Sequence, residues 1–177
     1  MARWVIKTEE DYKKARADIT RKLQGIVKAI KVATTGEIMD MLAETLEKAV
    51  SMAPVEEGSL REAGHCDVNG VTFARGTIDG GITRNDAALP DTDAKEQIFE
   101  IGFWVPGGGS GREGDINAYA WVQHEHVEFY HPDPVRLPGG RTVKGGQAKF
   151  LENAINADLT SWAERVKKAM NDAAKEV

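Results

Sequence analysis

The sequence predicts a single α+β domain in which two long helices flank a small antiparallel sheet. Apolar residues keep helical spacing from Glu9 to Met52, and they return to it from Gln147 onward. Between these segments lie short alternating runs, separated by glycine-rich and proline-rich turns. The 177 residues suffice for one core, and no internal repeat divides them. We therefore expect one domain over residues 1–177, with its sheet within about 60–105.

The first helix is expected over residues 9–52. Its apolar positions follow in steps of three and four and so share one face: Tyr12, Ala15, Ile19, Leu23, Ile26, Val27 and Ile30, then Ile38, Met41, Leu42, Leu46, Ala49, Val50 and Ala53. Thr34-Thr35-Gly36 weakens the helical propensity in the middle of this segment, but the spacing of the apolar residues continues across it. One long helix, straight or kinked, or two collinear helices fit this pattern. A helix this long outruns its own core, so the remainder needs a partner or a strongly polar surface.

A corner follows at Ala53-Pro54-Val55-Glu56-Glu57-Gly58-Ser59-Leu60-Arg61. Pro54 ends the helix because proline lacks the amide donor and its ring collides with the preceding turn. Gly58 permits a sharp reversal. Leu60 is expected to open an extended segment that leads into the sheet.

The sheet begins with a hairpin. Asn69-Gly70 favours a type I′ turn between strands at 65–68 and 71–74, and Asp79-Gly80-Gly81 marks a second turn. Residues 85–95 are polar and indicate a loop. From Glu96 to Val105 the residues alternate, which places Phe99, Ile101, Phe103 and Val105 on one face. Residues 97–104 should pair antiparallel with the first hairpin, giving three or four strands.

A loop and a short helix are expected over residues 106–146, with the helix near 118–125 and an irregular proline-containing stretch at 132–140. The last helix is expected over about 147–175. Its apolar stripe is predicted to lie on the sheet: Phe150, Leu151, Ala154, Ile155, Leu159, Trp162, Ala163, Val166 and Met170.

Composition narrows the function classes. A net charge of −5 argues against broad binding to nucleic-acid phosphates. Cys66 is the only cysteine, so an internal disulfide is impossible, and a reducing cytoplasm is the expected compartment. No apolar run approaches the roughly 20 residues of a membrane helix, and no signal-peptide core is seen. The charge is unevenly distributed, however, because residues 13–31 are basic and residues 37–57 are acidic. The two segments are either two solvated helix faces or complementary surfaces that meet between identical subunits.

One cluster has metal-ligand chemistry. On a strand, His124, His126 and Glu128 would share a face, and these are suitable ligands for zinc or iron. Their spacing matches no strong metal motif, and clustering without a metal is the simpler interpretation. A metal-dependent enzyme using these three residues is the alternative function.

The other chemical candidates have ordinary explanations. The glycine run Gly107–Gly114 lacks the Gly-Lys-Ser/Thr of a phosphate loop and indicates a flexible loop. His65 and Cys66 are strand neighbours with opposite directions, so a half-buried cysteine is expected rather than a nucleophile. Residues 137–141, Leu-Pro-Gly-Gly-Arg, predict a turn. We therefore expect a protein that is not an enzyme and uses no cofactor, metal or catalytic residue.

Aromatic residues crowd around the two irregular loops. They belong either to an ordinary small core or to a subunit interface, where tryptophan and tyrosine are enriched. On the second interpretation the candidate subunit contacts are Trp104, Tyr119, Trp121 and Tyr130.

Three separated motifs, in order, resemble those of phage neck and tail-completion proteins, minor virion proteins of long-tailed bacteriophages. The corner at 53–61 is similar to A-P-V-x-T-G-x-L-R, residues 119–125 to Y-A-x-x-x-E-x-G-T, and residues 147–155 to P-F-L-x-x-A. Glu125 is followed by His126-Val127 instead of Gly-Thr, and Lys149 replaces the proline.

The resemblance implies a structural role. Such subunits form a ring, often six-fold, between the head connector and the tail tube, or they complete the upper end of the tail. The implied partners are copies of the chain and neighbouring connector, tail-tube or terminator proteins. DNA passes through without specific binding, and no membrane is involved. The implied location is the virion neck or upper tail, with assembly in the host cytoplasm. Segments 107–114 and 132–146 are expected to become ordered against neighbours.

Overall fold

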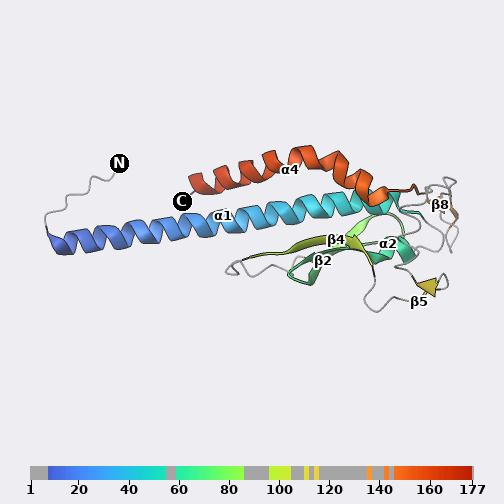
Figure 1. Cartoon of the computed structure of the whole chain (residues 1–177), viewed down its shortest axis with the longest axis horizontal. Helices are drawn as coiled ribbons and strands as arrows, with labels where there is room; N and C mark the ends of the chain where they lie inside the picture. Colours follow the sequence, from blue (N-terminus) through green and yellow to red (C-terminus); the bar gives the residue numbers. More distant parts are fainter. Residues whose placement is uncertain are drawn as a thin grey trace.

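The computed structural model describes residues 8–54, 59–85, 96–104 and 146–176, and four two-residue strands at 110–111, 114–115, 135–136 and 142–143. The described residues form a mixed α+β fold in three layers (Figure 1). The long helix α1 (Glu9–Met52) is the middle layer, between the helix α4 (Phe150–Lys175) and an antiparallel sheet. The predicted fold class is confirmed.

Helix α1 is one continuous helix of 44 residues. It begins with a capping box: the Thr8 hydroxyl accepts from the Asp11 amide at 3.1 Å, and the Asp11 carboxylate accepts from the Thr8 amide at 3.1 Å. Thr34 lies within the uninterrupted helix, and its hydroxyl donates back to the Ile30 carbonyl at 2.7 Å. Of the arrangements open from the sequence, the single uninterrupted helix is the one observed.

The corner differs from the prediction that Leu60 opens an extended segment. Ser59–Ala63 forms the short helix α2, and the first strand begins at Gly64. Leu60 and Arg61 are both 2% exposed. Neighbours in a strand point to opposite faces, whereas a helical turn lets both side chains pack beneath the end of α1. In this turn Leu60 joins the buried cluster of Ala49 and Phe150, while Arg61 reaches the Ala53 carbonyl at the end of α1.

The sheet has the order β3-β2-β1-β4, and every neighbouring pair is antiparallel. Its strands are β1 (Gly64–Val68), β2 (Val71–Gly76), β3 (Ile82–Arg84) and β4 (Phe99–Phe103). Asn69 and Gly70 have φ of 52° and 76°, which confirms the predicted hairpin turn. Residues 77–81 form the second predicted turn, closed by the Gly80 amide donating to the Thr77 carbonyl at 3.0 Å. Pairing of Cys66 with Ile101 confirms the expected place of β4.

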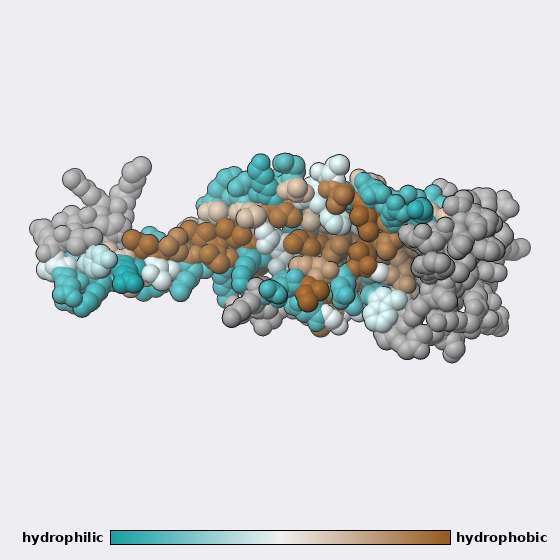
Figure 2. Space-filling model, in the orientation of Figure 1, coloured by the Kyte–Doolittle hydropathy of each residue, from teal (hydrophilic) through white to brown (hydrophobic). Residues whose placement is uncertain are grey.

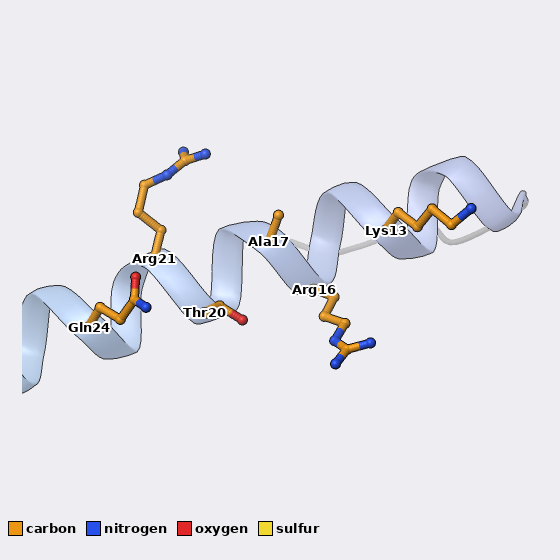
Figure 3. Close-up of a pocket in the computed structure, with 6 residues that line it drawn as sticks. All are labelled: Lys13, Arg16, Ala17, Thr20, Arg21 and Gln24. Carbon is orange, nitrogen blue, oxygen red and sulfur yellow. The ribbon is translucent and has the colours of Figure 1, made fainter.

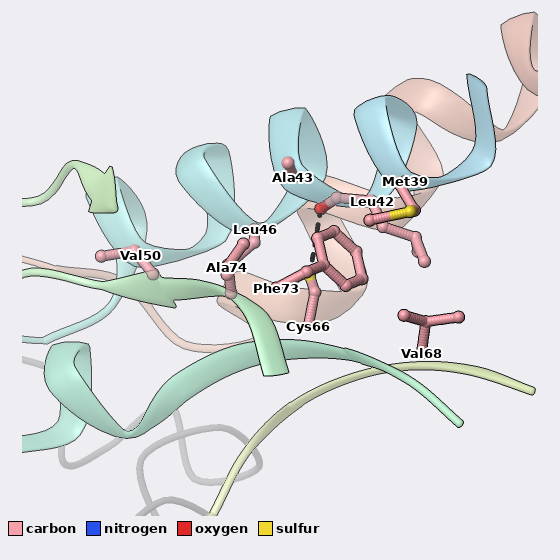
Figure 4. Packing of buried hydrophobic residues seen from close by; sticks show 9 residues of the cluster. All are labelled: Met39, Leu42, Ala43, Leu46, Val50, Cys66, Val68, Phe73 and Ala74. Carbon is pink, nitrogen blue, oxygen red and sulfur yellow. Dashed lines mark hydrogen bonds between the residues drawn. The ribbon is translucent and has the colours of Figure 1, made fainter. Parts of the chain in front are cut away.

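The main core lies between α1 and the inner face of the sheet (Figure 4). Its buried members are Met39, Leu42, Ala43, Leu46, Val50, Cys66, Val68, Phe73 and Ala74. Phe99, Ile101 and Phe103 pack against this cluster, as their alternation predicts; Val105 lies outside the described residues. Cys66 is fully buried rather than half-buried, and its thiol donates to the Leu42 carbonyl at 3.4 Å.

Helix α4 packs along α1, so the expectation that its stripe lies on the sheet is wrong. Because α1 already covers the inner face of the sheet, α4 finds its apolar partner on the opposite side of α1. Its first turn reaches the sheet edge, where the Phe150 and Phe103 rings meet edge-on with centroids 4.8 Å apart.

Between β4 and α4 the structure describes two small strand pairs. Strand β5 (Ser110–Gly111) pairs with β6 (Gly114–Asp115), and β7 (Val135–Arg136) pairs with β8 (Thr142–Val143). The turn predicted at 137–141 lies outside the described residues. The expected short helix at 118–125 also lies outside them.

Candidate functional site

Two of the three sequence motifs meet at the C-terminal end of α1. Arg61, from the corner, donates through Nε to the Ala53 carbonyl at 3.0 Å and through Nη2 to the Ser51 carbonyl at 3.3 Å. Gln147, the first residue of the third motif, donates through its backbone N–H to the Met52 carbonyl at 2.7 Å. The final carbonyls of a helix have no partner within it, and here residues from two other segments satisfy them.

The same joint is sealed by apolar packing. Ala49, Ala53, Leu60, Phe150 and Ala154 form one cluster in which no member is more than 2% exposed. Gly146 crosses directly over the end of α1, where a Cβ atom would lie 2.2 Å from Pro54 backbone atoms. These motif residues therefore specify the fold at the joint, and they offer no surface to a partner.

Arg61 is the functional group that sequence reasoning missed. Burial lowers the pKa of its guanidinium, and the nearby Asp79 carboxylate opposes that shift. The positive charge lies at the negative end of the α1 dipole, which favours it. The sequence shows an arginine shortly after the expected end of the helix. Its role as a cap could not be predicted, because it depends on the chain folding back so that Arg61 reaches the last carbonyls of α1.

The predicted contact residues are only partly described. Trp104 is 48% exposed, and its ring meets that of His65 edge-on with the centroids 5.4 Å apart. Tyr119, Trp121 and Tyr130 lie outside the described residues, as do His124, His126 and Glu128. Across the described ranges, no group of three or more histidine, cysteine or acidic residues is arranged to hold a metal ion. No helix in those ranges is both long and apolar enough to cross a membrane.

Cys66 and His65 occupy opposite faces of β1, as predicted. Burial, with a smaller effect of the Asp67 carboxylate, raises the pKa of the Cys66 thiol to about 12. His65 instead lies beside Trp104, with Nδ1 2.9 Å from the Ala63 carbonyl oxygen. A protonated, buried thiol without an adjacent imidazole cannot serve as a nucleophile.

The acidic half of α1 is largely paired within the chain. Arg165 of α4 binds Glu37 at 2.6 Å and Glu44 at 2.5 Å, and Arg84 of β3 binds Asp40 at 2.6 Å. The hydrogen bond from Arg165 lowers the pKa of Glu44. These carboxylates hold α4 and β3 onto α1, so they do not form the open acidic subunit surface that the charge pattern allowed; Glu56 and Glu57 lie outside the described residues.

The basic half of α1 projects beyond both α4 and the sheet (Figure 1). Three of its large apolar side chains are exposed, with Tyr12 54%, Ile19 50% and Leu23 57% accessible, whereas Ala15 is 5% exposed. A hydrophobic band runs along this projecting part in Figure 2. The prediction that the helix outruns its core is confirmed, and this projection is the main candidate surface for assembly.

Beside the apolar band lies a shallow, open hollow of about 430 Å³. All of its described lining residues come from α1: Lys13, Arg16, Ala17, Thr20, Arg21 and Gln24. Figure 3 shows Arg16 and Arg21 extending to opposite sides of the helix instead of toward a common point. The arrangement is a basic helix surface, and it has no set of converging groups that would bind a small ligand.

No protein-family model, curated protein or solved structure matches this chain. The surfaces that emerge from the described residues are the projecting part of α1 and the exposed face of Trp104. Trp104 and the band of Tyr12, Ile19 and Leu23 are apolar and exposed, which is the character of a contact surface between proteins.

Proposed function

We propose that this chain is a structural subunit of the head–tail connection of a long-tailed bacteriophage. In this role it forms a six-fold ring with copies of itself, in the neck or at the upper end of the tail. The ring joins the connector to the tail tube or its terminator, and DNA passes through it. The protein assembles in the host cytoplasm and remains in the virion, without catalysis.

One observation carries the proposal. The first and third motifs of the phage resemblance lie about 90 residues apart in the sequence, yet their residues Arg61, Leu60, Gln147 and Phe150 close one joint at the end of α1. Residues that matched the two family motifs only by chance would not be expected to pack against the same helix end. The order long helix, antiparallel sheet, C-terminal helix also agrees with what the resemblance implies.

The exposed surfaces support the same role. Ile19, Leu23 and Trp104 are each about half exposed in the isolated chain, which is costly unless another protein covers them. A ring buries such surfaces between adjacent subunits. The net charge of −5 suits a conduit, because an acidic lining repels the duplex and lets it slide.

The test is deletion of the gene from the phage genome that carries it, followed by electron microscopy of the particles. We expect DNA-filled heads and separate tails, and joined virions should return when the wild-type protein is supplied. Complete, normally joined virions without the protein would overturn the proposal.

The aromatic contacts are tested by supplying variant proteins to the phage that lacks the gene. We expect Trp121→Ala to impair the joining of virions more than it lowers the stability of the monomer, which the unfolding midpoint measures. Arg75→Ala, which changes an exposed β2 residue, is the control and should restore joining fully.

A further inference from the structure

We infer that strand β4 pairs antiparallel with β4 of a second copy, about a two-fold axis at Ile101, so that two sheets join into one. The inference goes beyond the proposed function, because it concerns the free protein and not its place in a phage particle. It rests on the open backbone groups of β4, on two exposed side chains at the ends of this strand, and on the position of Glu100.

Strand β4 is an edge of the sheet, with β1 on one side only. Ile98, just before β4, shows which way the backbone groups point: its carbonyl accepts from the Asn69 N–H at 2.8 Å, and its N–H donates to the Asn69 side chain at 2.9 Å. Because the direction alternates along a strand, the groups of Phe99, Ile101 and Phe103 point away from β1. Among the described residues, no hydrogen bond crosses that edge. Such an edge is a template for one further strand.

The side chains of β4 are also incompletely covered. On the inner face Phe99, Ile101 and Phe103 pack against the core cluster but remain partly exposed, whereas every residue of β1 is buried. On the outer face Ile98 is 62% exposed and Trp104 is 48% exposed, at opposite ends of the strand. A strand placed beside β4 covers apolar side chains on both faces and also binds the open backbone groups.

Charge and apolar contact select the register of self-pairing. With the two-fold axis at Glu100, two carboxylates would lie directly opposite each other, which is destabilising. With the axis at Gly102, Glu100 would lie opposite Trp104. With the axis at Ile101, Glu100 lies opposite Gly102, and Ile98 of each copy lies opposite Trp104 of the other. Only this last register pairs the two exposed apolar side chains and separates the carboxylates.

The same match selects a second copy of β4 as the occupant. In the register at Ile101, Phe99 lies opposite Phe103 on the inner face, so the two cores become continuous. The other edge of the sheet, β3, has only the residues Ile82–Arg84, and Arg84 already binds Asp40 of α1. That edge has no large apolar side chain on its outer face to cover Ile98 or Trp104, whereas β4 supplies both halves of the contact itself.

Sedimentation equilibrium of the full chain tests the pairing. We expect a reversible dimer whose dissociation constant rises by about tenfold or more in Ile98→Glu and in Trp104→Glu, because each change acts at both ends of the contact. Val71→Glu is the matched control: Val71 is 54% exposed and lies on β2, which β1 separates from the open edge, so the dimer should be unchanged. Circular dichroism should show equal secondary structure in all three variants, because each altered position is exposed.

Amide hydrogen exchange tests whether the backbone makes the contact. The N–H groups of Phe99, Ile101 and Phe103 face the open edge, so their exchange should slow as the protein concentration rises through the dissociation constant. The N–H groups of Glu100 and Gly102 already face β1, and their exchange should not follow dimer formation. Dimer formation that leaves the three edge amides unchanged would show that another surface pairs, and it would overturn the inference.

Cross-linking tests the register. Chains carrying Ile98→Cys and longer, tagged chains carrying Trp104→Cys are mixed and then oxidised; the buried Cys66 does not compete. In the register at Ile101 the two new cysteines have Cα atoms about 4.5 Å apart, within reach of a disulfide, whereas either variant alone holds its two cysteines about 20 Å apart. We therefore expect the mixed product alone.

Three results would overturn the inference: a wild type that stays monomeric, a dimer insensitive to Ile98→Glu, or efficient disulfide formation by either cysteine variant with itself. None of them bears on whether virions join, so the inference and the proposed function fail separately.

Discussion

At the scale of residues, the end of α1 depends on one buried arginine. Arg61 satisfies the Ala53 and Ser51 carbonyls with directional N–H donors, and its charge offsets the local negative potential of the helix end. Water cannot substitute for these bonds because the side chain is 2% exposed. The role of Arg61 is therefore structural, and its removal should be costly.

We predict that Arg61→Met destabilises the protein by about 2–4 kcal/mol, because similar volume is kept while buried carbonyls lose their donors. Urea unfolding followed by circular dichroism measures the loss. Arg75→Met, at an exposed position on β2, is the control and should stay within about 0.5 kcal/mol of the wild type. Equal stability of the two variants would refute the capping role.

At the scale of elements, α4 is held on α1 by a line of charges as well as by apolar contacts. Arg165 bridges Glu37 and Glu44, and Asp158 accepts from both Thr45 and Lys48. Burial acts to raise the pKa of Asp158, but the hydrogen bonds from Lys48 and Thr45 outweigh it, and the pKa lies below its usual value. The hydrogen bond from Arg165 likewise outweighs burial at Glu44.

These lowered values predict an acid-sensitive packing of α4. A carboxylate whose pKa is lower in the folded state contributes stability that is complete above its unfolded pKa, here 3.8 for Asp158 and 4.5 for Glu44. That contribution is lost as the pH falls through the folded values. Urea midpoints should therefore fall between about pH 5 and pH 3.

The variant Asp158→Asn isolates one of these groups. It cannot ionise, so its unfolding midpoint should depend less on pH over the same interval, and it should be lower than that of the wild type at pH 7. Asp172→Asn, which changes an exposed carboxylate in the last turns of α4, is the matched control and should keep the wild-type profile. An identical pH dependence in Asp158→Asn would contradict the assignment.

At the scale of the whole molecule, α1 acts as the central layer for part of its length and as a projection for the rest. Residues 39–50 lie between α4 and the sheet, and most are buried. The turns around Ile19 and Leu23 have no such cover among the described residues. Stability should therefore vary strongly along one continuous helix.

Amide hydrogen exchange measures that variation. We predict slow exchange at residues 39–50 and fast exchange at 12–24 when the protein is dilute enough to be monomeric. Uniform slow exchange along α1 in the monomer would show that the projection is held by other means.

Much of the fold followed from local patterns. The helical spacing of α1, the Asn69-Gly70 hairpin and the inward side of β4 were predicted because spacing and turn residues act over a few positions, whereas the spacing left open whether α1 is interrupted. The helical turn at Leu60 was not predicted, because it depends on two neighbouring side chains both finding a buried partner. The candidate contact Trp104 was found by residue type, whereas the capping role of Arg61 was missed.

The sequence by itself determined the two long helices, the sheet between them, their order and the surplus of apolar surface on the first helix, because periodicity and turn residues are local properties. Only the tertiary structure decided that α4 lies on α1 and not on the sheet, that the acidic residues of α1 are bound by Arg165 and Arg84, and that Arg61 and Gln147 close one helix end. Each of these depends on which of several apolar or charged faces is already occupied, and that is a property of the assembled layers.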